Sequence, residues 1–213
     1  MVRWGVSVLV ALWLAAGAQA ATIQNGDFET GDLTGWTISE AFGGRTLVQD
    51  VAPFDTTGAG ASNALRLQVG GPGRTGGIAR GIYLSQTIAI TTGGLHRFRA
   101  DFAFDWSAAG SNAYAGEVQL FADGVRLDRF GQSFISGGSV FRGTLEGDLD
   151  LNVGIIELSL LFARRADVSP NVGFHRVDNI SVVGPAPVPL PGGLPLLLAG
   201  IGTIYVVRRR RRR

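Results

Sequence analysis

The chain has 213 residues, no cysteine and a formal net charge of +2. Seven of the 19 basic residues are Arg3 and the last six residues, whereas all 17 acidic residues lie between Asp27 and Asp178, so the region between the two ends has a net charge of −5. An acidic domain argues against nucleic-acid binding. The lack of cysteine excludes disulfides, thiol nucleophiles and cysteine-ligated zinc.

Residues 1–20 have the pattern of a secretory signal peptide. Arg3 is followed by an apolar run from Trp4 to Ala16 and by Ala18-Gln19-Ala20, an A-x-A cleavage site. We expect a signal-peptide helix that is removed, with the mature chain beginning at Ala21. The alternatives are an uncleaved signal anchor and a buried helix; the shortness of the run and the adjacent small residues argue against both.

Residues 21–184 alternate apolar and polar residues in short stretches bounded by Gly, Pro, Asn and Asp, which is typical of β-strands. In the clearest stretch, His96 to Trp106, every second residue from Phe98 onward is apolar. The residues of opposite parity, which we expect to face solvent, include Arg97, Arg99, Asp101 and Asp105. The other expected strands are 46–50, 64–69, 82–90, 117–122, 125–130, 141–145, 155–163 and 177–183.

These strands predict the fold of the domain. Asp123-Gly124 is suited to a type I′ turn and predicts a hairpin, and no stretch sustains helical spacing. We therefore expect an all-β domain, an antiparallel two-sheet sandwich of the jelly-roll kind. A β-helix is the rival architecture, but no fixed-period repeat supports it.

Residues 148–154 have two interpretations. They resemble the opening of an EF-hand calcium loop, but Val153 stands where that loop requires glycine. Because the apolar residues alternate, we favour an edge strand with Asp148, Asp150 and Asn152 facing water.

The sequence identifies no catalytic residue. His96 and His175 are the only histidines, and no G-x-S-x-G motif accompanies them. We expect both to be solvated side chains on strands. A catalytic pair of carboxylates that hydrolyses glycosides remains an alternative, because the sequence does not give the distance between the acidic side chains.

Two motifs carry a resemblance to a known fold. NGDFETGDLTGW, from Asn25 to Trp36, and VDNISV near the end of the domain resemble the first and last strands of galactose-binding-like jelly-roll domains, including carbohydrate-binding modules. The shift in apolar parity at residues 178–179 also predicts a β-bulge.

The resemblance implies a structural calcium ion that joins the first turn to the last strand. By position, Glu29 and Asp178 would be its carboxylate ligands, and Asn25, Gly31 or neighbouring carbonyls would complete the oxygen shell. The alternative is that these acids only cap turns.

Carbohydrate-binding modules stack sugars on exposed aromatic rings, so the resemblance also suggests ligand-binding residues. The candidates are Trp106 and Tyr114, at the two ends of a loop, and Phe42 and Phe54 in Gly-rich loops. Trp36, within the opening motif, is expected in the core.

The end of the chain has three parts. Residues 185–193 form a Pro-rich linker, residues 194–207 an apolar run, and residues 208–213 an arginine cluster. As a helix the run would be about 21 Å long, against a hydrocarbon core of about 30 Å. We expect one short transmembrane helix whose arginines stay in the cytoplasm.

This tail resembles the PEP-CTERM sorting signal in its VPLPA variant, which exosortases of Gram-negative bacteria recognise. The motif residues are Val188, Pro189, Leu190, Pro191 and Gly192, with Gly192 in place of the usual Ala. The residues that set the topology are Arg208, Arg209, Arg210, Arg211, Arg212 and Arg213. The resemblance implies export, anchoring in the inner membrane, cleavage near Pro191 and transfer to the cell surface or extracellular matrix, often alongside exopolysaccharide production.

Together these features predict an exported, non-enzymatic surface or matrix protein whose jelly roll binds polysaccharide. Its expected partners are the exosortase, the membrane before processing, and extracellular polysaccharide. A secreted glycan-active hydrolase and a purely structural surface protein are the alternatives.

Overall fold

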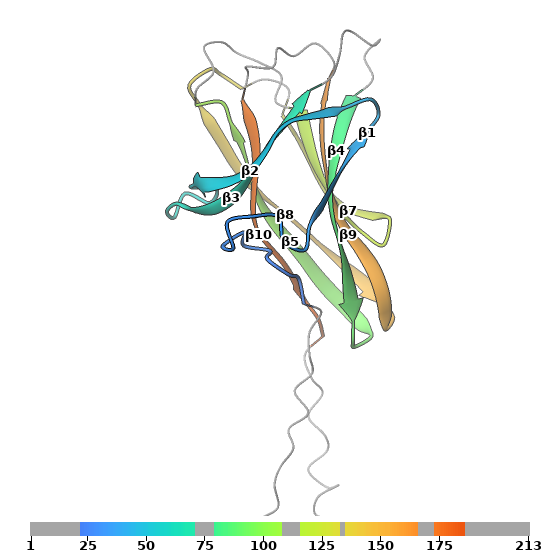
Figure 1. The fold of residues 1–213 in the computed structure, drawn as a ribbon. Coiled ribbons are helices and arrows are strands. Elements are labelled where there is room, and N and C mark those ends of the chain that lie inside the picture. The colour runs from blue at the N-terminus through green and yellow to red at the C-terminus, as the bar shows by residue number, and fades with distance from the viewer. Residues whose placement is uncertain (1–21, 71–78, 108–115, 133–134, 166–172, 186–213) are drawn as a thin grey trace, which may run out of the picture. The chain divides into compact units, whose positions relative to one another are not determined.

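A computed structural model describes residues 22–70, 79–107, 116–132, 135–165 and 173–185. These residues form ten β-strands and no helix (Figure 1). The strands are β1 (Thr37–Ala41), β2 (Arg45–Phe54), β3 (Ser62–Gly70), β4 (Ala79–Ile90), β5 (Gly94–Asp105), β6 (Gly116–Ala122), β7 (Val125–Gln132), β8 (Val140–Leu151), β9 (Gly154–Arg165) and β10 (Phe174–Val183). The all-β prediction is confirmed, and β1 is the strand that the sequence analysis did not separate from the opening turns.

The strands form two five-stranded sheets, in the orders β1-β4-β9-β6-β7 and β2-β3-β10-β5-β8. The pairs within them are antiparallel, which confirms the two-sheet sandwich. Pro53 lies in β2, an edge strand, where a missing backbone N–H is tolerated.

The core between the sheets is rich in aromatic side chains from β5. Phe98, Phe102 and Phe104 are at most 1% exposed. The Phe104 ring centroid lies 5.5 Å from that of Phe102 and 5.3 Å from that of His175 on β10. The alternation predicted for β5 is therefore confirmed on its core face, and Trp36 is buried as expected.

Four polar side chains are buried where the sequence predicted contact with solvent. His96 and His175 are each 1% exposed. His96 lies two residues before the core residue Phe98, and His175 lies two residues before Val177, so both histidines face the core. Asp101 and Asp105 do face outward from β5, but each is 4% exposed. Neighbouring side chains on the same outer face cover them, so these predictions of exposure were wrong.

Two local predictions agree with the structure. β8 is an edge strand on which Asp148 and Asp150 are exposed, and Asn152 is exposed just beyond its end. Asp123 and Gly124 join β6 to β7 with φ values of 50° and 75°, as a type I′ turn requires.

The two ends of the sandwich differ. At the first, which we call the turn end, residues 91–93 join β4 to β5 and residues 152–153 join β8 to β9. Pro185 also lies here, because a Cβ added to Gly94 would be 3.2 Å from the Cγ of Pro185. The opposite end, the loop end, holds the strand termini on either side of 71–78, 108–115, 133–134 and 166–172 (Figure 1).

Candidate functional site

The N-terminal segment meets a bulge in the last strand. β10 shifts register against β5 between Asp178 and Ser181, and Asn179 has a φ of 52°, so the predicted bulge is confirmed. Beyond it, the Ile180 N–H donates to the Gly26 carbonyl oxygen at 2.8 Å. Residue 26 must be glycine for this approach, because an added Cβ would lie 2.1 Å from the Ile180 oxygen.

Trp36 fixes the N-terminal segment in this position. Its Nε1–H donates to the Asn25 carbonyl oxygen at 2.9 Å, and its ring centroid lies 5.9 Å from that of the buried Phe28. The opening motif therefore closes on the core through its aromatic residues and leaves its polar residues at the surface.

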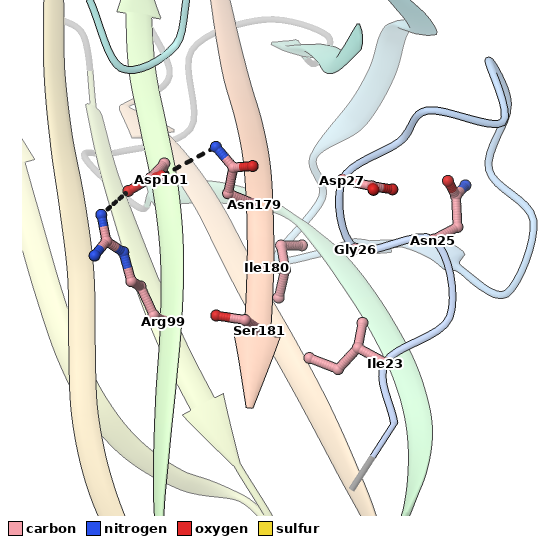
Figure 2. Close-up of a pocket in the computed structure, with 9 residues that line it drawn as sticks. All are labelled: Ile23, Asn25, Gly26, Asp27, Arg99, Asp101, Asn179, Ile180 and Ser181. Carbon is pink, nitrogen blue, oxygen red and sulfur yellow. Dashed lines mark hydrogen bonds and ion pairs between the residues drawn. The ribbon is translucent and has the colours of Figure 1, made fainter. Parts of the chain in front are cut away.

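An open pocket of about 610 Å³ lies between this segment and the outer face of β5 and β10. Figure 2 shows Asn25, Gly26 and Asp27 on the N-terminal segment across from Arg99, Asp101 and Asn179 on the strands. Ile23, Ile180 and Ser181 complete the lining. The lining is mostly polar and offers both hydrogen-bond donors and acceptors.

Asp101 is the most firmly held of the lining side chains. It accepts hydrogen bonds from Thr144 Oγ1 at 2.7 Å, from Asn179 Nδ2 at 3.1 Å and from the Arg99 guanidinium at 3.1 Å. These donors replace the hydrogen bonds that the carboxylate would make with water if it were exposed. The neighbouring Arg99 keeps half of its side chain exposed, so it can also reach a ligand.

Next to the pocket, Glu29 and Asp178 both contact the start of β3. Glu29 Oε1 accepts from the Asn63 amide at 2.9 Å, and Asp178 Oδ2 accepts from Ser62 Oγ at 2.6 Å. Burial raises the pKa of Asp178; hydrogen bonds from Ser62 and Asn179 oppose this, and the nearby charges of Glu29 and Asp101 add to it. Asp178 is thus a buried acid beside other acids, and within the described chain it forms no ion pair.

This arrangement suits part of the calcium ligand set that the sequence suggested. A hard cation would relieve the repulsion at Glu29 and Asp178. Asn25 and Gly31 are placed differently: the Asn25 side chain bonds the Asp32 carbonyl and the Thr30 amide, and Gly31 lies in the exposed turn. In the described ranges, no group of three or more His, Asp or Glu side chains could hold a metal ion.

The suggested sugar-stacking residues are dispersed. Trp106 is fully buried, with its ring centroid 6.2 Å from that of Phe104 and 6.0 Å from that of His175, so it presents no face to a ligand. Phe42 is 61% exposed in the turn between β1 and β2. Tyr114 lies outside the described residues, and none of the other three lines the pocket.

Phe54 belongs to an arrangement that the sequence did not predict, a ladder of arginine and phenylalanine side chains on the sheet that contains β10. The Arg176 guanidinium lies 4.5 Å from the Phe54 ring centroid and 5.6 Å from that of Phe174. Arg142 continues the ladder at Phe54 and Arg66 at Phe174. Each arginine also pairs with a carboxylate: Arg176 with Asp105, Arg142 with Asp55 and Arg66 with Asp50.

The sorting motif, from Val188 to Gly192, and the terminal arginines, from Arg208 to Arg213, lie outside the described residues. Within the ranges described, no helix is long and apolar enough to cross a membrane.

Several pocket residues were missed by the sequence analysis. Asp101, Arg99 and Asn179 come together because the bulge turns the Asn179 side chain towards β5. The parity shift at residues 178–179 was the available signal, since a bulge redirects side chains. The parity shift does not show which strand lies beside the bulge, so the contact of Asn179 with Asp101 could not be predicted.

Comparisons with known proteins find similarity of fold. No protein-family model and no curated protein matches the chain. Among solved structures, a family 61 carbohydrate-binding module in complex with β-1,4-galactotriose is 12% identical, covering 76% of this chain and 97% of that chain with a TM-score of 0.46. A family 22 xylan-binding domain from Paenibacillus barcinonensis is 16% identical, covering 76% and 94% with a TM-score of 0.38. The cleaved adhesin domain of Lys-gingipain from Porphyromonas gingivalis is 17% identical, covering 75% and 96% with a TM-score of 0.41.

Proposed function

We propose that this chain is the precursor of an exported surface or matrix protein whose β-sandwich binds polysaccharide without cleaving it. The observation that supports binding is the polar pocket between the N-terminal segment and the outer face of β5 and β10. Its volume of about 610 Å³ falls within the range of about 300–1,000 Å³ that is usual for small-molecule sites.

The chemistry of the lining suits sugar hydroxyl groups, which donate and accept hydrogen bonds. Arg99 supplies donors, Asp27 and Asp101 supply acceptors, and Asn179 supplies both. Asp101 is held by three hydrogen-bonding partners, so its carboxylate need not be ordered when a ligand binds. A sugar unit at the end or side of a polysaccharide fits such an open pocket.

Arg99→Gln tests the pocket, and Arg97→Gln is its matched control. Both arginines are exposed on the same face of β5, but only Arg99 lines the pocket. We expect Arg99→Gln to weaken binding about tenfold in affinity electrophoresis, because a hydrogen bond to a charged group contributes about 1.5–3 kcal/mol and each 1.4 kcal/mol is tenfold. Arg97→Gln should leave binding unchanged.

The polysaccharides in this test should include neutral, acidic and amino-substituted chains. If none of these polysaccharides binds, or if both variants lose affinity equally, the pocket is not the binding site. Release of reducing ends from a bound polysaccharide would contradict the non-catalytic part of the proposal and favour a hydrolase.

Export and sorting form the second part of the proposal, supported by the signal-peptide pattern and by the order of VPLP motif, apolar run and arginine cluster. An exosortase would cleave near Pro191 while residues 194–207 hold the precursor in the inner membrane. Mass spectrometry of the mature protein from cells should find a C-terminus near Pro191. An intact arginine end in the mature pool would refute the sorting proposal.

We also propose that calcium stabilises the domain through Glu29 and Asp178, with backbone oxygens or water as the remaining ligands. The carboxylate of Asp178 supports this, because it is buried beside Glu29 and, within the described chain, has hydrogen-bond donors but no cationic partner. Bound calcium would supply the positive charge that this junction lacks.

A further inference from the structure

Four large apolar side chains are exposed at the turn end of the sandwich. Leu95, Val153, Ile155 and Val183 are 59%, 68%, 76% and 63% exposed. They come from three different parts of the chain, at the start of β5, around the turn between β8 and β9, and at the end of β10. We call them the apolar rim.

The rim surrounds one end of the core. A Cβ added to Gly93 would be 3.9 Å from the Val153 backbone nitrogen, so the two turns touch. Val183 pairs with Arg97 across the sheet, and Leu95 lies two residues before Arg97 on the same outer face. The side chains directly inside the rim are buried and apolar: Ile90, Leu151, Ile156 and Val182.

Leu95 and Val183 lie on the outer face of one sheet and Ile155 on that of the other, so the four side chains encircle this end of the domain. Exposed apolar groups concentrated at one end of a domain indicate an interaction surface. The described chain ends at the rim, because Pro185 lies against Gly94 within this end. Eight residues, 186–193, separate it from the apolar run that begins at Leu194. At no more than about 3.6 Å per residue, they reach at most about 29 Å.

We propose that the apolar rim rests on the lipid bilayer in which residues 194–207 are anchored. This inference relies on the membrane-anchor part of the proposed function. The sandwich then stands on its turn end, with the strand termini of the loop end facing away from the membrane.

The charges near the rim indicate that the contact is apolar. Asp150 pairs with Leu95 across the sheet, Asp148 lies two residues earlier on β8, and Glu157 lies two residues after Ile155. Arg97, which is also beside the rim, forms an ion pair with Asp148. Basic residues attract proteins to anionic headgroups, and acidic ones do not. The rim should therefore contact zwitterionic lipid at least as well as anionic lipid.

The lack of cysteine in the chain makes a site-specific test straightforward. Val153→Cys, Gly200→Cys and Phe42→Cys would each carry an environment-sensitive fluorophore in the full precursor, reconstituted in phosphatidylcholine vesicles that contain a spin-labelled lipid. Phe42 is the matched control because it is 61% exposed but lies beside the start of β4, at the loop end.

We expect blue-shifted, lipid-quenched emission at positions 153 and 200 and unquenched, water-like emission at position 42. Quenching at 200 without quenching at 153 overturns the rim contact and leaves the anchor intact. No quenching at 200 overturns the anchor and the inference with it. A blue shift at 153 without lipid quenching shows that protein covers the rim, which also overturns the proposal.

Discussion

At the scale of single residues, the ion pair between Asp105 and Arg176 is the most buried one among the described residues. The two side chains are 5% and 8% exposed, and Asp105 Oδ2 accepts from Arg176 Nη2 at 2.8 Å and Nε at 3.1 Å. Each charge is buried with its partner, so removal of one leaves the other uncompensated. The pair also holds Arg176 against the Phe54 ring.

Asp105→Asn should therefore destabilise the domain by about 3 kcal/mol, measured by chemical denaturation. Asp148→Asn is the matched control, because Asp148 pairs with Arg97 at the exposed surface, where ion pairs contribute little. If the free energy of unfolding fell equally in the two variants, burial would not explain the contribution of the Asp105–Arg176 pair.

Asp32 is expected to make the stability of the domain sensitive to acid. Hydrogen bonds from the Thr30 hydroxyl and from Thr34 lower its pKa below 3.8. A carboxyl with a lowered pKa in the folded state contributes stability above pH 3.8 and loses it as the pH falls through the lowered value.

Asp32→Asn retains a side-chain carbonyl oxygen but has no charge to lose. It should be slightly less stable than the wild type at pH 6, and the difference should vanish near pH 2. Thermal unfolding of both proteins at the two pH values measures this. A difference that stays constant with pH would show that the charge is unimportant.

At the scale of elements, the hairpin between β6 and β7 depends on backbone conformation at its turn. Gly124 has a φ of 75°, and no atom lies within 4 Å of a Cβ added there. Gly124→Ala should then cost about 1 kcal/mol through backbone strain alone. Gly154→Ala, in equally open space but without a positive φ, should not destabilise the protein; equal losses in the two variants would contradict this explanation.

The strands were predictable from the sequence because alternation and turn residues act locally. Phe98, Phe102 and Phe104 indicated the core face of β5, and Asp123-Gly124 indicated the hairpin between β6 and β7. Which strands become neighbours is not local information, so the burial of Asp101 beneath Asn179 and Arg99 could not be read from the sequence. The pocket depends on that pairing and was missed for the same reason.

At the scale of the whole domain, the junction of Glu29 and Asp178 joins the first segment to the last strand. An ion bound there would stabilise the folded state, since the two residues are far apart in an unfolded chain. We expect added calcium to raise the melting temperature of the wild type and to leave Asp178→Asn unchanged.

Asp123→Asn makes the same substitution at an exposed aspartate outside this junction, and this variant should still respond to calcium. A wild type that melts at the same temperature with calcium and with chelator would contradict the calcium proposal.

The division of the sandwich into a turn end and a loop end has an evolutionary consequence. The turns at residues 91–93 and 152–153 are short, and each joins a strand of one sheet to a strand of the other, β4 to β5 and β8 to β9. The connections at the other end, from β3 to β4, β5 to β6, β7 to β8 and β9 to β10, have more residues, and the entropic cost of closing a loop rises by only about 0.6 kcal/mol for each doubling of its length. Insertions can therefore accumulate at the loop end and diversify its surface, while strand pairing and the exit of the chain at Pro185 stay unchanged.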